Sequence, residues 1–226
     1  MKKLLVSDFD ETFFFKDKSL AENIYYVNKW TLKNLFVIAT GRSYMDYYNK
    51  AKDIKTNYLI INHGATILKN NQVIYNIPIG NDVVNKINKD LLLEQKEIFC
   101  CSEKESRVDI NSKDITKIHI YCNNLKKSEE LMKYLTNNYP VNCYLITGGK
   151  SIEVVSNKVN KAKAIFKIME QENINIDNVY TIGNGYTDID MIKEFKGFSI
   201  TGSVNELTKY SNKNYNSVAD LIKELL

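Results

Sequence analysis

The stretch LLVSDFD, residues 4–10, decides the fold of this chain, because an apolar run ends there in two carboxylates one residue apart. A short continuous apolar run predicts a strand buried on both faces, as in a parallel sheet. Asp8 and Asp10 follow where that strand gives way to a loop, so both side chains can project into a crevice above the sheet. Like charges this close repel unless a cation or a proton lies between them. The pair therefore indicates a metal site or a division of acid and base roles, and a loop that caps the next helix is the structural alternative.

Strands and helices alternate outward from this run. Leu35–Ala39 and Tyr58–Ile61 predict two further buried strands, with helices over 19–33 and 43–52 between them. The same rhythm returns after residue 157, with a helix over 160–172, a strand at Val179–Ile182, a short helix from about Asp188, a strand at Phe198–Thr201 and a helix from Val218. This order is typical of an α/β protein with a Rossmann-like parallel-sheet core, whose functional loops lie at the carboxyl ends of the strands.

The pattern changes between residues 81 and 156, where strands outnumber helices. It predicts helices over 82–94 and 126–138 and strands at 97–101, 106–110, 115–122, 142–147 and 151–155. We expect an α+β domain with an antiparallel sheet at 81–156, inserted into a core domain made of 1–80 and 157–226. Gly148-Gly149-Lys150 either faces the site or forms a tight hairpin turn, and the turn is the simpler interpretation.

Composition limits the classes of function. The chain of 226 residues is 44% hydrophobic, and its net charge of +4 comes from scattered lysines, which indicates a solvated surface and not a nucleic-acid interface. Asp8 interrupts the apolar start too early for a secretion signal, and no run of ~18 apolar residues predicts a membrane span. Four cysteines without paired spacing favour free buried thiols in a reducing cytosol: Cys100, Cys101, Cys122 and Cys143. We expect a cytoplasmic protein, a monomer or weak homodimer, with neither nucleic acid nor membrane as partner.

Thr40-Gly41-Arg42 directly follows the second apolar strand and precedes a helix that opens near Ser43. A hydroxyl and free backbone N–H groups at a helix amino terminus bind phosphate oxygens, although an ordinary strand-to-helix turn would also need the glycine. Lys161 begins the helix after the inserted block, where its ammonium could reach a phosphate and a nucleophile together. Lysines at helix starts are commonly only solvated, so position alone does not select it.

The stretch GNGYTDIDM, residues 183–191, follows the strand at Val179–Ile182. Its glycines permit a tight loop, and the oxygen atoms of Asn184 and Asp188 can point at a hard cation. A helix cap by Thr187 or Asp188 would explain the same pattern without a metal.

Taken in this order, the four pieces resemble the four motifs of the haloacid dehalogenase-like superfamily. The resemblance is closest to its Cof-like phosphatases, with a C2-type cap between the second and third motifs. The segment Asn62–Ile67 and the spacing of Glu153 from Lys161 resemble the same family. The resemblance implies a Rossmann-like core with an inserted α+β cap domain at 81–156. It also implies these roles: Asp8 as nucleophile, Asp10 as acid and then base, Thr40 and Lys161 on the phosphoryl group with Phe9, Gly41, Arg42 and Thr187 around it, and Asp8, Asp10, Asn184 and Asp188 at the magnesium site.

Three positions depart from the family pattern. Glu11 stands where a glycine usually follows the second Asp, and Thr187 replaces the usual Asn. Asn184 stands where an Asp is expected, which removes one negative charge from the magnesium site. An amide oxygen can still bind the metal, but more weakly.

The resemblance thus implies a Mg²⁺-dependent phosphohydrolase that acts on a small phosphorylated metabolite, such as a sugar phosphate, through an aspartyl-phosphate intermediate. A phosphomutase, which returns the phosphoryl group to the substrate, is one alternative. A non-catalytic sensor of a phosphorylated ligand is another, which Asn184 leaves open although Asp8, Asp10, Thr40 and Lys161 together weigh against it. A purely structural interaction module would leave the two strand-end carboxylates unexplained.

Overall fold

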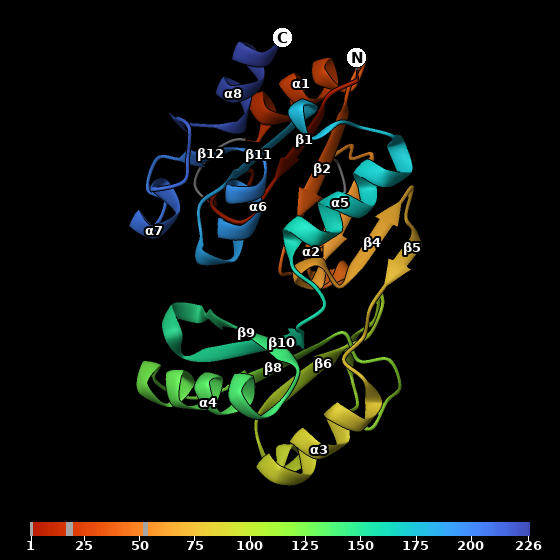
Figure 1. Cartoon of the computed structure of the whole chain (residues 1–226), viewed down its shortest axis with the longest axis vertical. Coiled ribbons are helices and arrows are strands. Elements are labelled where there is room, and N and C mark those ends of the chain that lie inside the picture. The colour runs from red at the N-terminus through yellow and green to blue at the C-terminus, as the bar shows by residue number, and fades with distance from the viewer. Residues whose placement is uncertain (1, 17–19, 52–53) are drawn as a thin grey trace.

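The computed structural model describes residues 2–16, 20–51 and 54–226. Two β-sheets, each with its own helices, form an upper and a lower unit in Figure 1. Within the described residues the upper sheet has eight strands, in the order β13 (Asn214–Tyr215), β12 (Lys196–Ile200), β11 (Val179–Gly183), β1 (Leu4–Ser7), β2 (Leu35–Ala39), β3 (Tyr58–Ile61), β4 (Thr66–Lys69) and β5 (Gln72–Asn76). The lower sheet has five strands there, in the order β7 (Ser106–Val108), β6 (Ile98–Cys101), β8 (Lys117–Tyr121), β10 (Ser151–Ser156) and β9 (Val141–Ile146).

Helices cover both faces of the upper sheet. One face packs on α1 (Ala21–Trp30), α2 (Tyr44–Ala51) and α8 (Val218–Leu225), and the other on α5 (Lys161–Glu172), α6 (Ile189–Glu194) and α7 (Asn205–Thr208). Successive side chains of β1 alternate between the two cores, with Leu5 in the first and Leu4 and Val6 in the second. Burial on both faces is why the strands read as uninterrupted apolar runs, and each such aliphatic side chain contributes roughly 1.5–3 kcal/mol.

The strand register brings three predicted motifs to one edge of the upper sheet. β1 lies between β2 and β11 and is parallel to both, and Ser7 stands opposite Ile38 on one side and Ile182 on the other. Asp8, Thr40 and Asn184 therefore leave the sheet at neighbouring points of its carboxyl edge, where ligand crevices of open α/β sheets lie. The predicted α/β fold with a parallel-rich sheet and a second, strand-rich unit is confirmed.

The sequence analysis did not predict β4, β5, α7 and β13 of the upper unit. β4 and β5 form an antiparallel hairpin at the sheet edge, and Asn70 and Asn71 join them at φ of 50° and 62°, the left-handed backbone of a two-residue hairpin turn. α7 and β13 are too short for periodicity to show them.

The lower unit is two-sided. Alternate residues of its strands, among them Ile118, Ile120 and Ile152, pack under α3 (Asn81–Leu91) and α4 (Leu125–Asn138). The other face of the sheet is turned toward the upper unit (Figure 1). The chain passes between the units twice, from β5 to α3 and from β10 to α5. The helices and strands expected at 81–156 are present, while the division into separate domains stays a prediction.

The structure also tests the predictions made for the first two helices, the glycine turn and the cysteines. The helices expected over 19–33 and 43–52 are α1 and α2, and residues 19 and 52 lie outside the described residues. β9 and β10 pair as a hairpin whose turn holds Gly148 and Gly149 at φ of 62° and 82°, so the turn interpretation is confirmed. The four cysteines are free, as expected, but only Cys100, Cys101 and Cys122 are buried, and Cys143 is half-buried.

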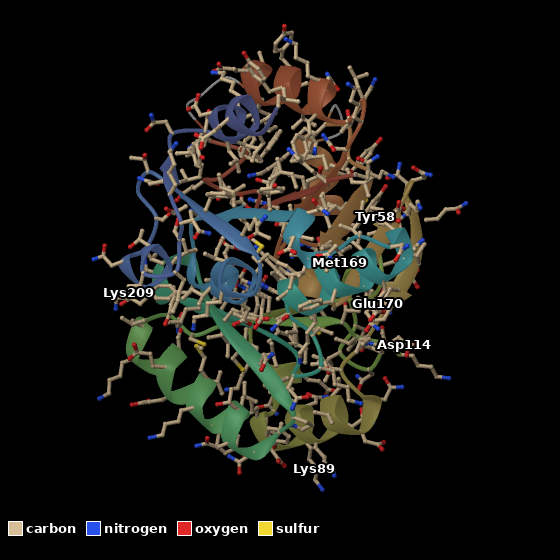
Figure 2. The ribbon with its side chains drawn as sticks, turned by 45° about the horizontal axis from the view of Figure 1, so that its top comes forward. Tyr58, Lys89, Asp114, Met169, Glu170 and Lys209 are labelled. Atoms are coloured by element: carbon tan, nitrogen blue, oxygen red, sulfur yellow. The ribbon has the colours of Figure 1, made fainter. Side chains whose placement is uncertain are left out.

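Charged side chains project from the periphery, as Lys89 on α3 and Lys209 after α7 show in Figure 2. Both are exposed. Among the residues that the structure describes, no helix is long and apolar enough to cross a membrane.

Candidate active site

Asp8, the first residue after β1, is held in place by its neighbours. Its amide donates to the Ile182 carbonyl at 2.9 Å, and its side chain is almost completely buried, with 7% of the residue exposed. The Lys161 ammonium donates to Asp8 Oδ1 and to Asp188 Oδ1, both at 2.6 Å. Three predicted site residues that are far apart in the sequence thus meet at the carboxyl edge of the sheet.

The start of α5 is shaped to bring Lys161 to this point. Asn160 caps the helix, because its side-chain oxygen accepts a hydrogen bond from the Lys163 amide at 2.8 Å. The turn after β3 packs closely against this start, since a Cβ on Gly64 would lie 2.3 Å from the Asn160 carbonyl oxygen. Gly64 also has φ of 101°, so only glycine permits this approach.

Asp188 is fixed by the loop that precedes it. Its Oδ2 accepts hydrogen bonds from the amides of Asn184 and Gly185, at 3.0 and 2.9 Å, while its Oδ1 faces Lys161. Thr187 lies in the short 3-10 turn before it, and both Thr187 and Asn184 are half-buried. The Asn184 side-chain amide takes part in no hydrogen bond within the described part of the chain.

The site carries more negative than positive charge. Burial and the neighbouring Asp188 carboxylate raise the pKa of Asp8 to about 7, although Lys161 and a hydrogen bond from the Phe9 amide act in the opposite direction. Burial lowers the pKa of Lys161, but the two carboxylates outweigh it and raise that pKa above its ordinary value. One ammonium thus serves two buried carboxylates, and the charge left over favours a further cation.

Asp10 is not part of this cluster. Both of its carboxylate oxygens accept hydrogen bonds from Arg42, from Nε at 2.7 Å and from Nη2 at 2.6 Å. The pair is partly exposed at the mouth of the site. A forked arrangement of this kind occupies both side-chain oxygens of Asp10 and the Arg42 guanidinium at the same time.

Thr40, Gly41 and Arg42 form the turn between β2 and α2, as predicted. Thr40 is buried, and its hydroxyl oxygen accepts a hydrogen bond from the Arg42 amide at 3.1 Å. Phe9 supplies its amide to Asp8, while its ring packs against Phe14 and Tyr47. The ring thereby anchors the loop after β1 to the core.

A sequence model of the haloacid dehalogenase-like hydrolases matches residues 5–112 and 101–220, which is most of the chain. The chain belongs to the haloacid dehalogenase-like hydrolases. The predicted family, its Cof-like branch and the predicted enzyme class are therefore confirmed.

Individual relatives agree with this family. The hydrolase is 26% identical over 228 residues to 5-amino-6-(5-phospho-D-ribitylamino)uracil phosphatase YcsE of Bacillus subtilis, across 92% of this chain and 86% of the relative. Its fold is similar to that of a haloacid dehalogenase-like hydrolase from B. subtilis, with a TM-score of 0.86 at 17% identity over 99% of this chain and 100% of that one. A haloacid dehalogenase-like hydrolase from Bacteroides thetaiotaomicron gives a TM-score of 0.84 at 18% identity over 100% of both chains.

The donors at the centre of this hydrolase fit a hard divalent cation. The carboxylates of Asp8 and Asp188 offer oxygen ligands, which Mg²⁺ prefers, and Lys161 leaves part of their charge unbalanced. No group of three or more His, Cys, Asp or Glu side chains stands together as a ready metal cage within the described residues. Mg²⁺ commonly binds through one or two carboxylates and keeps several waters, so two carboxylates suit it.

Four polar residues beside the site were missed by the sequence analysis or noted only for their spacing. Glu153 Oε1 accepts from Lys117 at 2.8 Å and lies 3.3 Å from His119 Nδ1, and Glu153 Oε2 lies 2.6 Å from His63 Nε2. All four are buried between the lower sheet and the upper unit. The stretch KIHIY, residues 117–121, did carry a signal, because its polar and apolar residues alternate as in a strand with one polar face.

Proposed function

We propose that the chain is a Mg²⁺-dependent phosphatase that acts on a small phosphorylated metabolite, of the sugar phosphate class, through an aspartyl-phosphate intermediate. The observation that carries the proposal is the meeting of Asp8, Lys161 and Asp188 at the carboxyl edge of the sheet, next to the Thr40–Arg42 turn. A buried carboxylate beside a lysine and a turn with free N–H groups suits attack on phosphorus.

Asp8 is the nucleophile in this proposal. Its carboxylate would attack phosphorus, and the leaving oxygen would depart with a proton, which leaves the phosphoryl group on Asp8. The Lys161 ammonium lies 2.6 Å from Asp8 Oδ1, so it would stabilise the charge of both the nucleophile and the phosphoryl oxygens. The Thr40 hydroxyl and the Gly41 amide would donate to those oxygens.

Asp10 is the acid and then the base. It is bound to Arg42, and a phosphoryl group entering the turn would compete for the same guanidinium hydrogen bonds. Asp10 released in this way could take up a proton from solvent and donate it to the leaving oxygen, and the resulting carboxylate could later take a proton from the water that hydrolyses the aspartyl phosphate. Mg²⁺, held by Asp8 and Asp188 with Asn184 and Asp10 nearby, would supply charge neutralisation at the phosphoryl group.

The unit at 81–156 is a cap in this proposal. Its polar sheet face lies against the carboxyl edge of the upper unit, where it would exclude water from the first transfer and contact the rest of the substrate. One relative is named as a phosphatase of 5-amino-6-(5-phospho-D-ribitylamino)uracil, which supports a phosphorylated metabolite as substrate.

The test is a screen of phosphorylated metabolites with Mg²⁺ that measures both free phosphate and isomeric products. We expect phosphate release from at least one sugar phosphate, abolished by chelation of the metal and by Asp8→Asn. Asp8→Asn should leave the fold intact, because Lys161 keeps its partner Asp188. Formation of an isomer without phosphate release would indicate the mutase instead, and tight binding of a phosphorylated ligand without turnover would indicate the sensor.

A further inference from the structure

The carbonyl groups of the Thr40–Arg42 turn are all bonded to donors outside the turn. The Thr40 carbonyl accepts from the His63 amide at 3.2 Å, and the Arg42 carbonyl accepts from the Asn62 amide at 2.9 Å. The Gly41 carbonyl accepts from the Lys117 ammonium at 2.7 Å. Two donors thus belong to the upper unit, and the third comes from β8 of the lower unit.

These hydrogen bonds also fix the direction of the N–H group at the other end of each peptide unit. In a planar trans peptide the carbonyl and the following N–H point in opposite directions. The Gly41 carbonyl faces Lys117, so the Arg42 amide points the other way, onto the Thr40 hydroxyl oxygen at 3.1 Å. That oxygen is thereby used as an acceptor, and its hydrogen is free to donate to a phosphoryl oxygen.

The Gly41 amide completes this cradle. The Thr40 carbonyl is held by the His63 amide, so the Gly41 N–H points away from that side. No hydrogen bond among the described residues uses it. The His63 ring packs directly on this glycine, because a Cβ there would lie 2.4 Å from His63 Cε1. The conformation of the turn therefore depends on both His63 and Lys117.

Lys117 is held in a buried ion pair, although no step of the proposed reaction uses its side chain directly. The residue is 1% exposed, and Glu153, itself 6% exposed, holds the ammonium at 2.8 Å. Glu153 also binds both histidines of the chain, His63 and His119. Removing the two charges of an ion pair from water is costly, and a hydrophobic pair in the same place would often be as stable, so stability alone explains the buried Lys117–Glu153 pair poorly.

We infer that Lys117 is a positioning residue, supplied by the lower unit to the phosphate-binding turn, and that Glu153 holds it there. Seating of the lower unit on the upper one would then orient the Arg42 amide and the Thr40 hydroxyl for a phosphoryl group. The inference rests on the proposed function and deepens it, because it makes the affinity of the turn for phosphate depend on a cap residue.

The test compares the Lys117→Met/Glu153→Gln double variant with Lys89→Met and the unmodified protein. The double change keeps the net charge and avoids an unpaired buried Glu153, while Lys89 is an exposed lysine of the same unit that points to solvent (Figure 2). Thermal unfolding reports stability, and ¹H–¹⁵N spectra follow the Gly41 and Arg42 amides during titration with orthophosphate and Mg²⁺. We expect near-normal unfolding of the double variant, displaced amide resonances, and a Kd for orthophosphate raised about tenfold.

The outcomes separate the positioning role from the proposed function. If the Lys117–Glu153 pair is purely structural, the charge-balanced double variant should keep both its stability and its orthophosphate affinity. Unchanged amide resonances with an unchanged Kd would therefore overturn the positioning role. The double variant could show displaced Gly41 and Arg42 resonances while the unmodified protein neither binds orthophosphate nor releases it from esters. That result would support the positioning role and overturn the proposed function. Lys89→Met should match the unmodified protein throughout.

Discussion

At the scale of single residues, one positive charge decides the chemistry of the site. Lys161 lies 2.6 Å from two carboxylates and can balance only one of them. Burial and the neighbouring Asp188 carboxylate raise the pKa of Asp8. The negative charge that Lys161 leaves unbalanced attracts a cation, and the same lysine holds the two carboxylates together. Asn184 adds no charge to this balance, although it follows the strand beside β1.

Asn184→Asp should tighten Mg²⁺ binding about tenfold, or about 1.4 kcal/mol. A full negative charge at ligand distance is worth several kcal/mol even at an effective dielectric of ~20, but repulsion from Asp8 and Asp188 and the dehydration of Mg²⁺ remove much of it. Calorimetric titration with Mg²⁺ measures the change. Asn85→Asp, which adds the same charge on an exposed face of α3, is the control and should leave the affinity unchanged. Equal affinities of Asn184→Asp and the unmodified protein would show that residue 184 does not touch the metal.

The sequence predicted most of the candidate site because three of its four motifs directly follow a strand. Asp8, Thr40 and Asp188 could be placed at one edge from strand order, whereas Lys161 could be selected only by the family resemblance, because lysines at helix starts are commonly only solvated. The partner of Asp10 could not be predicted, because Arg42 could equally have faced a phosphate. The contacts of Lys117 with Gly41 and Glu153 could not be predicted for a different reason. They depend on how the two units pack, which no local sequence pattern encodes.

At the scale of elements, α5 is fastened at both ends. Lys161 binds the site at its first residue, and Glu172 binds the sheet at its last. Glu172 Oε1 accepts hydrogen bonds from Lys69 and Tyr58, and Oε2 accepts from Lys2. The helix that carries Lys161 is therefore tied to β3 and β4 as well as to the core.

Glu172→Gln should lower the free energy of unfolding at pH 7 by about 1 kcal/mol, a value discounted because Lys69 and Lys2 are partly exposed. Hydrogen bonds from Lys69, Tyr58 and Lys2 lower the pKa of Glu172 to about 2 in the folded protein. Its pKa in the unfolded chain is about 4.3, so the stabilisation is complete above that value and is lost as the pH falls toward 2.

Urea unfolding at pH 7, 5, 4 and 3 checks this prediction. The difference between Glu172→Gln and the unmodified protein should shrink at the two lowest pH values. Glu170→Gln is the matched control on the same helix (Figure 2), since its side chain is 68% exposed and pairs only with Lys167 among the described residues. A difference that stays constant from pH 7 to pH 3 would contradict the assignment to the Glu172 carboxylate.

The elements that the sequence predicted correctly are those with a long or strongly patterned signal. β1, β2, β3 and β11 are buried on both faces and read as apolar runs. The β4–β5 hairpin was missed because β5 is only half-buried and its pattern is mixed. The two asparagines of its turn were the available signal, since Asn tolerates the left-handed backbone better than most residues.

At the scale of the whole molecule, the apolar cores of the two units are separate. The two cores of the upper unit contain no residue from 81–156, and the core of the lower unit runs from Ile79 to Val154. A small cluster of Ala65, Val155 and Val159 is the apolar contact at the junction. From these separate cores we predict that each unit can fold on its own.

Joining residue 80 to residue 157 by a short linker should therefore leave a folded protein. Circular dichroism and thermal unfolding should show one cooperative transition, at a somewhat lower temperature because the junction cluster becomes exposed. The shortened protein should still hydrolyse small aryl phosphates, because Asp8, Lys161 and Asp188 all belong to the upper unit. It should lose selectivity among larger substrates, since the residues that would contact them are removed.

The same shortened protein also lacks Lys117, which ties this prediction to the phosphate-binding turn. Without the ammonium the Gly41 carbonyl is left to water, so orthophosphate should bind at least as weakly as to the Lys117→Met/Glu153→Gln double variant. Titration of both proteins with orthophosphate and Mg²⁺ makes the comparison, with Asp8→Asn in the shortened protein as the inactive control for hydrolysis. A shortened protein that does not fold would show that the two units are one cooperative domain. One that folds and binds orthophosphate as tightly as the full chain would show instead that the turn holds its shape without the lower unit.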